Sequence, residues 1–301
     1  MKPSIAGYAL VLGAAASWGL WPFLLRVAER FGPVDAAVWS AALMGLTTLA
    51  TVPSLRGCNL QAAPRSAVVA LVFLGITDAA NAWFFFQAYR TTTVALAVST
   101  HYLAPILVAL FAPIVNREPR HPRAVVAAIA AFIGLLFILN PWAATLDHHA
   151  VVGSLFGVAS AFAYAGNVFL NRRIGHAFTG AQVMALHGFV ATPLLIAFTS
   201  ASAWERTSSG TFAVLAVAAL TIGAASGIAF ITGLRLIPTA HSAVLTFAEP
   251  IVALLLGVLV LGESLAPRAV AGALAIVGAG VFVVLPTKAV AQPAKGKQLP
   301  V

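Results

Sequence analysis

The amino-acid sequence predicts an all-α integral membrane protein with ten transmembrane helices, arranged as two inverted five-helix repeats. Two observations lead to this fold class. Hydrophobic residues make up 61% of the 301 residues and charged residues only 8%, whereas a soluble chain carries about 25% charged residues. In addition, the sequence aligns with itself, because residues 90–125 match residues 235–270 without a gap.

Apolar stretches long enough to cross a bilayer, about 20 residues each, recur along nearly the whole chain. In chain order, we expect membrane-spanning helices over residues 5–25, 35–53, 66–88, 95–115, 124–140, 151–170, 181–199, 212–234, 240–261 and 267–285. Short connections separate them. Residues 286–301 are rich in Lys, Pro, Ala and Gln and cannot bury a core, so we expect a disordered cytoplasmic tail there.

The internal match defines the domain organisation. It pairs Arg90 with Arg235, Pro105 with Pro250, and Glu118 with Glu263. Apolar matches are common in so hydrophobic a chain, but matched Arg, Pro and Glu are not, so the chain holds two copies of one unit. We expect a first repeat over residues 1–140 and a second over residues 151–285.

Each copy contains five spans, an odd number, so the second copy enters the membrane from the face opposite to the first. Inverted repeats of this kind are typical of secondary transporters, in which the two halves open a central site to each side in turn.

The net charge of +9 does not indicate a nucleic-acid partner. The Lys and Arg residues lie in loops between the spans, twelve on the side of the N-terminus and five on the other side or at helix ends there. Positive residues concentrate on the cytoplasmic side of membrane proteins. We therefore expect a multi-pass protein of the inner (plasma) membrane with both termini in the cytoplasm. Its expected partners are the lipid bilayer and a small-molecule substrate; a monomer is compatible with the sequence, which leaves the oligomeric state open.

Ionisable side chains inside a bilayer are costly, so each one is a candidate functional residue. Asp78 in the third span shares a helix face with Asn81, Phe85 and Tyr89, which is typical of a cavity wall. The alternative is that Asp78 pairs with a neighbouring polar group. His187 in the seventh span is interpreted as a helix-packing residue.

His101 and Glu249 lie beside the two matched prolines. His101 stands four residues before Pro105, and its counterpart is Thr246; it either binds substrate or relays a proton, or it hydrogen-bonds a Ser or Thr of a neighbouring helix. Glu249 directly precedes Pro250. The sequence is compatible with either a structural role or a proton-coupling role for Glu249.

Aromatic and amide side chains complete the expected cavity. Trp18 and Trp21 flank the kink expected at Pro22, and the sixth span places Tyr164 and Asn167 on one stripe. The full set of candidate substrate-binding residues is Trp18, Trp21, Asp78, Asn81, Phe85, Tyr89, His101, Tyr102, Tyr164, Asn167, Thr246 and Glu249. The coupling candidates are Asp78, His101 and Glu249, and the hinge candidates are Pro22, Pro105 and Pro250.

Two matched pairs of charged residues are interpreted as structural. Glu118 and Glu263 precede the fifth and tenth spans, where an acidic residue offsets the positive end of the helix dipole. Arg90 and Arg235 are expected to anchor helix ends at the membrane interface.

Several motifs together resemble one known family. They are Trp18-Gly19, the run Ala88-Tyr89-Arg90-Thr91-Thr92, Tyr102-Leu103-Ala104-Pro105 leading to Glu118, and Phe247-Ala248-Glu249-Pro250 leading to Leu261-Gly262-Glu263. Over about residues 5–285 the chain resembles the EamA-type drug/metabolite transporter superfamily. The resemblance implies a ten-span exporter with two EamA repeats and a cavity lined by spans one, three, four, six, eight and nine. Subgroups of that family export amino acids, carry nucleotide sugars or organic phosphates, or expel toxic compounds, and these motifs do not separate them.

Other functional classes fit the sequence less well. A membrane-embedded enzyme needs clustered ligands or paired carboxylates, and an ATP-driven pump needs a phosphate-binding loop; neither pattern occurs. We expect no catalytic residue, metal or cofactor. A carrier of phosphorylated sugars should hold Lys or Arg deep in the membrane, and only Arg26, near an outer helix end, approaches this. The sequence therefore favours export of amino acids or related aromatic or amphipathic metabolites, with a multidrug or toxic-cation exporter as the alternative.

Overall fold

The computed structural model describes residues 4–285; the tail expected over residues 286–301 lies outside the described residues. Within this range nine helical segments are long and apolar enough to cross a bilayer, and an apolar helix of 17 residues, α9, makes a tenth. The all-α membrane fold is confirmed. Its elements are α1 (Ile5–Trp18), α2 (Trp21–Glu29), α3 (Ala36–Thr51), η1 (Val52–Leu55), α4 (Arg65–Thr91), α5 (Val94–His101), α6 (Ala104–Val115), α7 (Pro122–Leu139), η2 (Pro141–Ala143), α8 (His148–Ile174), α9 (Gly180–Ile196), α10 (Ala201–Glu205), α11 (Ser209–Ala218), η3 (Ala219–Ala225), α12 (Ser226–Leu234), α13 (Thr239–Leu245), α14 (Ala248–Leu259) and α15 (Pro267–Val284).

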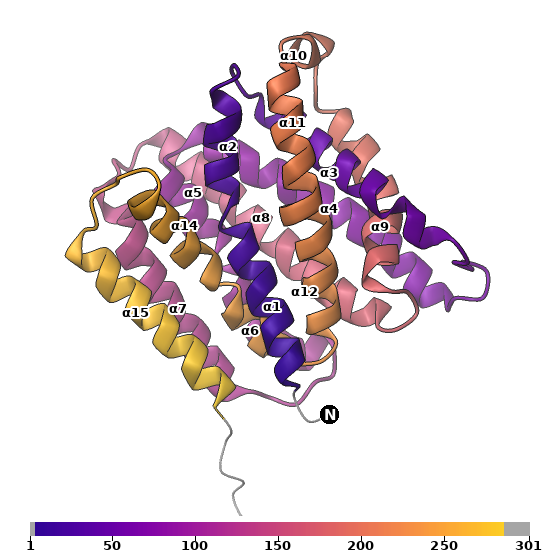
Figure 1. Ribbon diagram of the computed structural model, residues 1–301. Helices are drawn as coiled ribbons and strands as arrows, with labels where there is room; N and C mark the ends of the chain where they lie inside the picture. Colours follow the sequence, from indigo (N-terminus) through magenta and orange to yellow (C-terminus); the bar gives the residue numbers. More distant parts are fainter. Residues whose placement is uncertain (1–3, 286–301) are drawn as a thin grey trace, which may run out of the picture.

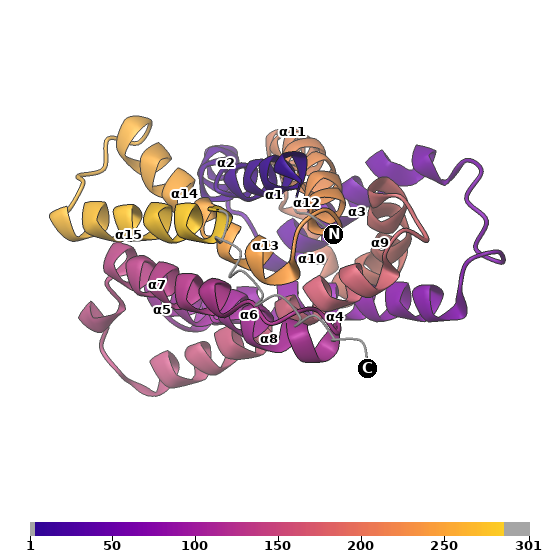
Figure 2. The same ribbon diagram turned by 90° about the horizontal axis from the view of Figure 1, so that it is seen from below.

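Corresponding helices of the two repeats pack against each other across the molecule. The fifth spans, α7 and α15, form one pair and the second spans, α3 and α9, form another. These pairs lie on opposite sides of the molecule (Figures 1 and 2). Between them, α1 packs on α12 just as α8 packs on α4, and α6 contacts α13. The interior of the bundle is thus built mainly from spans one, three, four, six, eight and nine.

The α7–α15 pair shows the inversion directly. Arg123, near the start of α7, donates hydrogen bonds to the carbonyl oxygens of Phe282 and Leu285 at the end of α15, so the two helices run antiparallel. Their backbones meet at glycine, because a Cβ on Gly134 would lie 2.6 Å from the Gly272 carbonyl oxygen. Small residues allow such close approach where membrane helices pack.

The outer surface of the bundle is apolar. The α7–α15 pair exposes valine, isoleucine and leucine side chains, of which Val126, Ile133, Leu274 and Val281 are each about half exposed or more. In a soluble protein such a surface would be buried, whereas hydrocarbon chains cover it at no cost. The cluster of buried residues beneath it contains mainly alanine, which brings the helices close together.

Three of the spans are broken near a proline. The first span stops at Trp18 and restarts at Trp21 with Pro22 in its first turn, and the fourth stops at His101 and restarts at Ala104 before Pro105. The ninth stops at Leu245 and restarts at Ala248 before Pro250. Proline lacks a backbone donor and fits best in the first turn of a helix, and each of these three prolines lies in the first turn of a new helical segment.

Glu118 joins the two repeats, because it contacts Thr239, three residues after Leu236, whose carbonyl oxygen accepts a hydrogen bond from Ser4 at the start of α1. The end of the bundle where α1 begins and α15 ends (Figure 1) is here called the termini face. The Glu118 carboxylate accepts hydrogen bonds from the backbone N–H (2.9 Å) and the hydroxyl of Thr239, and it forms a 2.9 Å ion pair with Arg172. Thr239 begins α13 in the other repeat. The expectation that Glu118 serves its own following helix is therefore wrong: it caps a helix 121 residues away, and α13 has no side-chain cap of its own.

The matching contact at the opposite face is looser. Glu263 forms a 2.8 Å ion pair with Arg26, but both side chains are about half exposed, at 49% and 55%. Here α5, the counterpart of α13, is capped by its own Thr93. Arg235 also departs from the sequence interpretation: it is 8% exposed and donates to the Phe178 carbonyl oxygen at 2.8 Å, so it is buried rather than placed at the interface.

We expect Glu118→Ala to lower the free energy of unfolding by about 2–4 kcal/mol, because the change removes a helix cap and leaves a partly buried arginine unpaired. The matched control is Glu263→Ala in the other repeat, which breaks an exposed ion pair and should cost less than about 1 kcal/mol. Thermal unfolding of both variants in the same lipid nanodiscs measures the difference. Equal losses would show that Glu118 does not hold the repeats together.

Candidate functional site

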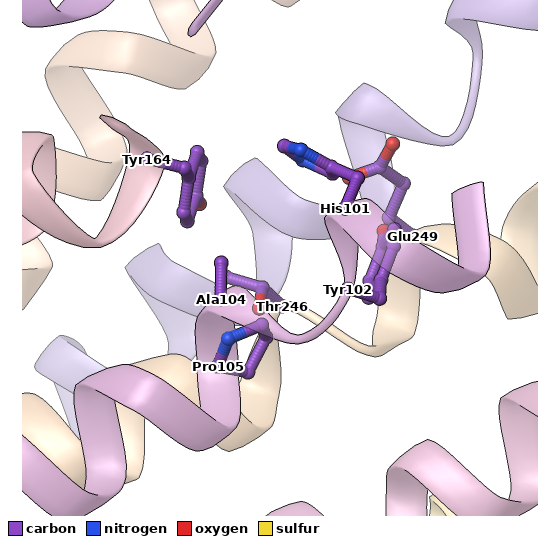
Figure 3. Close-up of a pocket in the computed structure, with 7 residues that line it drawn as sticks. All are labelled: His101, Tyr102, Ala104, Pro105, Tyr164, Thr246 and Glu249. Carbon is purple, nitrogen blue, oxygen red and sulfur yellow. The ribbon is translucent and has the colours of Figure 1, made fainter. Parts of the chain in front are cut away.

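A small pocket lies where the breaks in the fourth and ninth spans meet. Figure 3 shows its lining, in which side chains from both breaks converge with a tyrosine of α8. The lining residues are His101, Tyr102, Ala104, Pro105, Tyr164, Thr246 and Glu249. The structure therefore places five of the candidate substrate-binding residues and two of the three helix breaks around one space.

Hydrogen bonds fix the orientation of His101. Its Nδ1 lies 2.8 Å from the Ser160 hydroxyl oxygen, and Ser160 lies within hydrogen-bond distance of the Asn81 side-chain oxygen, at 2.9 Å. The sequence left open whether His101 bonds a serine or lines a cavity, and in the structure it does both. Asn81 is thus connected to the pocket residue His101 through two hydrogen bonds.

Aromatic rings extend from the pocket toward α2. His101 contacts Phe85 with ring centroids 4.9 Å apart and Tyr164 at 5.6 Å. Trp21 contacts Phe85 at 6.2 Å and Tyr89 at 6.3 Å, in edge-to-face arrangements. Rings at these separations attract each other beyond their buried area. Trp21, Phe85 and Tyr89 therefore form an aromatic wall next to the pocket without lining it.

The electrostatics of the pocket come from one carboxylate and one helix end. Glu249 lies in the first turn of α14, where an ionised carboxylate would offset the positive end of the helix dipole. The matched position in the first repeat is Ala104, so α6 begins at the pocket with no acidic residue in its first turn. The Tyr102 hydroxyl and the Trp21 indole face Glu249, and the Tyr102 hydroxyl closes no hydrogen bond of good geometry within residues 4–285.

Asp78 and Asn167 lie in a second polar cluster and not in the pocket lining. Asn167 donates a 2.9 Å hydrogen bond to Asp78 Oδ1, and His187 Nε2 lies 3.2 Å from Asp78 Oδ2. Thr77 also contacts Asn167. The view of His187 as a packing residue only was incomplete, because it contacts a carboxylate. No sequence pattern links these residues, which lie up to 110 positions apart.

Trp18 serves the scaffold. Its indole donates a 3.0 Å hydrogen bond to the Ile222 carbonyl oxygen and its ring packs on Phe230. Ile222 belongs to η3, a π-helical turn that interrupts the eighth span. Such turns leave backbone carbonyls without their usual partners and are frequent at functional sites. Trp18 therefore satisfies a backbone group that would be costly to leave bare in a membrane.

Gly19, next to Trp18, brings the first span against the ninth. A Cβ at this position would lie 2.6 Å from both the Glu249 carbonyl oxygen and Val252 Cβ. The Trp18-Gly19 and Glu249-Pro250 motifs therefore contact each other directly. Within residues 4–285, no group of three or more His, Cys, Asp or Glu side chains is placed to hold a metal ion.

Ten apolar helices in two antiparallel repeats, with broken helices around a central pocket, define an inverted-repeat membrane transporter. The family model for the EamA-like transporter family matches the chain twice, over residues 5–140 and 151–285. The protein belongs to the EamA-like transporter family, a family of transporters and not of enzymes.

Relatives of known sequence agree with this assignment. The chain is 26% identical over 174 residues to the uncharacterized transporter YxxF of Bacillus subtilis (strain 168), a match covering 58% of this chain and 56% of the relative. It is also 26% identical over 192 residues to the uncharacterized transporter YcbK of the same organism, covering 60% and 59%. These matches span little more than half of the relatives' own lengths.

The fold also occurs in a crystal structure that superposes on this one with a TM-score of 0.78. The superposition covers 93% of this chain and 98% of the other, at 16% sequence identity. At that identity the likeness concerns the fold alone.

We expect Gly19→Ala to destabilise the protein by about 1–3 kcal/mol, because the added methyl group overpacks the contact between the first and ninth spans. The control is Gly13→Ala in the same span, within α1, where a Cβ would meet nothing within 4 Å. This change should be neutral or stabilise by up to about 1 kcal/mol through helix propensity. Thermal unfolding in nanodiscs compares the two, and equal behaviour would contradict the close contact at Gly19.

Proposed function

We propose that this protein is a secondary active transporter that exports amino acids or related aromatic and amphipathic metabolites by alternating access. In this proposal it lies in the inner (plasma) membrane with both termini in the cytoplasm, which places the termini face on the cytoplasmic side. The pocket between the broken fourth and ninth spans is the substrate site.

The observation that carries the proposal is the pairing of opposite electrostatic features in one small pocket. Glu249 supplies a carboxylate that attracts an ammonium group, and the start of α6, whose first turn carries no acidic residue, supplies the positive end of a helix dipole that favours a carboxylate. An amino acid carries both groups on one carbon atom. Tyr164 and His101, with the aromatic wall behind them, provide a surface for an apolar or aromatic side chain.

The same lining argues against phosphorylated solutes. None of the seven residues that surround the pocket is Lys or Arg, and phosphate sites usually contain at least one such cation.

The two matched ion pairs support alternating access. Glu118 and Glu263 lie 145 residues apart, and their partners Arg172 and Arg26 lie 146 apart, so the pairs occupy corresponding places in the repeats. One pair is largely buried and caps α13, while the other is half exposed and caps nothing. In the proposed cycle the two repeats exchange these states, so that Glu263 takes up the capping role and Glu118 releases it.

A multidrug or toxic-cation exporter is the second candidate. It is favoured by the single carboxylate, Glu249, in an aromatic setting with no compensating cation in the pocket lining. This alternative gives no role to the start of α6, because an organic cation has no anionic group to place there. Asp78, His101 and Glu249 are the proposed coupling residues in either case.

Efflux from proteoliposomes separates these candidates. Vesicles are loaded with amino acids, their decarboxylated amines, aromatic cations and sugars, and the contents are followed by mass spectrometry against protein-free vesicles under an imposed pH gradient. We expect selective loss of one or more amino acids with retention of the matching amines, since only the amino acid engages both ends of the pocket. Loss of amines and cations alone would favour the toxic-cation exporter.

We expect Glu249→Gln to reduce transport of the identified solute at least 10-fold, because a hydrogen bond to a charged group is worth about 1.5–3 kcal/mol. Glu205→Gln, the same change at an exposed residue of α10, should leave the rate unchanged. Initial efflux rates in matched proteoliposomes provide the comparison. If the Glu249→Gln variant transported the solute at the wild-type rate, Glu249 would not be a substrate-binding residue.

A further inference from the structure

The polar cluster of Asp78, Asn167 and His187 lies inside the membrane-spanning part of the protein but outside the pocket. It joins three helices, α4, α8 and α9. The His187 side chain is 4% exposed and that of Asp78 is 25% exposed. Groups of this kind are expensive to bury, so their arrangement calls for a physical account.

The hydrogen-bond pattern of the cluster requires a proton. His187 Nδ1 lies 2.6 Å from the Val183 carbonyl oxygen, and since a carbonyl only accepts, Nδ1 carries a hydrogen atom. In a neutral imidazole, Nε2 then presents a lone pair. That lone pair faces Asp78 Oδ2 at 3.2 Å, and an ionised carboxylate has no hydrogen atom to donate. The contact is attractive only if one additional proton sits on Nε2 or on Oδ2.

The remaining contacts of Asp78 do not replace this proton. Asn167 donates to the other carboxylate oxygen, Oδ1. Among the neighbouring ionisable groups, Tyr164 on α8 interacts electrostatically with Asp78, and His101 lies on α5, which packs on both α4 and α8. The neighbouring α3 and α12 carry no ionisable residue within their bounds. On α4 and α8 the other ionisable side chains lie toward the helix ends: Arg65, Tyr89, Arg90, His148, His149, Arg172 and Arg173.

We propose that Asp78 and His187 form a binding site for one proton, and that the bound proton holds α4 and α9 together. Loss of the proton leaves two lone pairs facing each other in a buried site, so the helices separate or admit water. The inference that this proton is the coupling ion rests on the proposed transport function; the binding site itself does not.

The packing around the site connects it to helix movement. Gly75 lies one turn before Asp78, and a Cβ there would lie 2.6 Å from the His187 carbonyl oxygen and 2.5 Å from Val190 Cβ. Helices α4 and α9 are therefore in direct contact where the proton binds. The same α4 carries Phe85 of the aromatic wall, and α8 carries both Asn167 and the pocket residue Tyr164. A movement at the proton site thus reaches the pocket through two shared helices.

Distance measurements between spin labels test the proposal without any solute. The single cysteine, Cys58, is replaced by serine, and labels are placed on cysteines at two half-exposed positions, Val72 on α4 and Phe189 on α9. In nanodiscs, we expect the mean label distance to increase by about 2 Å or more as the pH rises, the scale of helix shifts at switching interfaces. Asp78→Asn and His187→Gln should each abolish this pH response.

Matched controls carry the same substitutions at exposed positions. Asp147→Asn retains a helix-capping residue, and His176→Gln alters an exposed histidine; both should keep the full response. A response that survives in Asp78→Asn or in His187→Gln, or a labelled parent that shows none, would overturn the proposal. Because no solute is present, these outcomes are independent of whether the transport assay identifies a substrate. Transport without any pH-dependent helix movement would refute the proton site and leave the proposed function standing.

Discussion

A membrane offers no water to satisfy a broken helix, and this constraint governs the centre of the molecule. Where the fourth and ninth spans restart at Pro105 and Pro250, backbone groups lose their helical partners inside the apolar bundle. Non-helical backbone at this depth is stable only when other protein groups or a cavity surround it. At these breaks the polar side chains of Thr246, Glu249 and His101 line the pocket, and Thr246 donates a hydrogen bond to the Ala243 carbonyl oxygen near the end of α13. The pocket follows from the need to enclose these breaks.

Much of the fold could be predicted from the sequence because the membrane reduces the problem to length and polarity. Apolar stretches indicated the spans, and matched residues such as Arg90 and Arg235 indicated the repeat. The odd number of spans per repeat then implied the inversion. These signals are local or follow a fixed spacing. The helix breaks were less visible, since proline predicts a disturbance but not whether the helix bends or restarts.

The candidate site was predicted only in part, because helical periodicity relates residues of one helix and not of different helices. Asp78, Asn81, Phe85 and Tyr89 do share one face of α4, but 11 residues of helix extend about 16 Å. This face of α4 therefore extends from the polar cluster around Asp78 at one end to the aromatic wall at the other. Contacts such as Asp78 with His187 and Glu118 with Thr239 join residues more than 100 positions apart, and no spacing rule indicates them.

The two repeats have the same arrangement of helices but differ in their polar residues. This difference distinguishes positions that maintain the fold from positions proposed to bind the substrate or a proton. Among the matched positions that keep their residue type, Pro105 and Pro250 lie at helix breaks, and Glu118 and Glu263 form the two matched ion pairs. Positions that change type, Ala104 with Glu249 and Asp78 with Gly223, carry the charges of the interior. In the proposed cycle a symmetric scaffold would give two exchangeable conformations, and the asymmetric charges would give a single site with defined ends. A substrate held between Glu249 and the start of α6 would thus keep one orientation in the pocket while the surrounding repeats exchange their states.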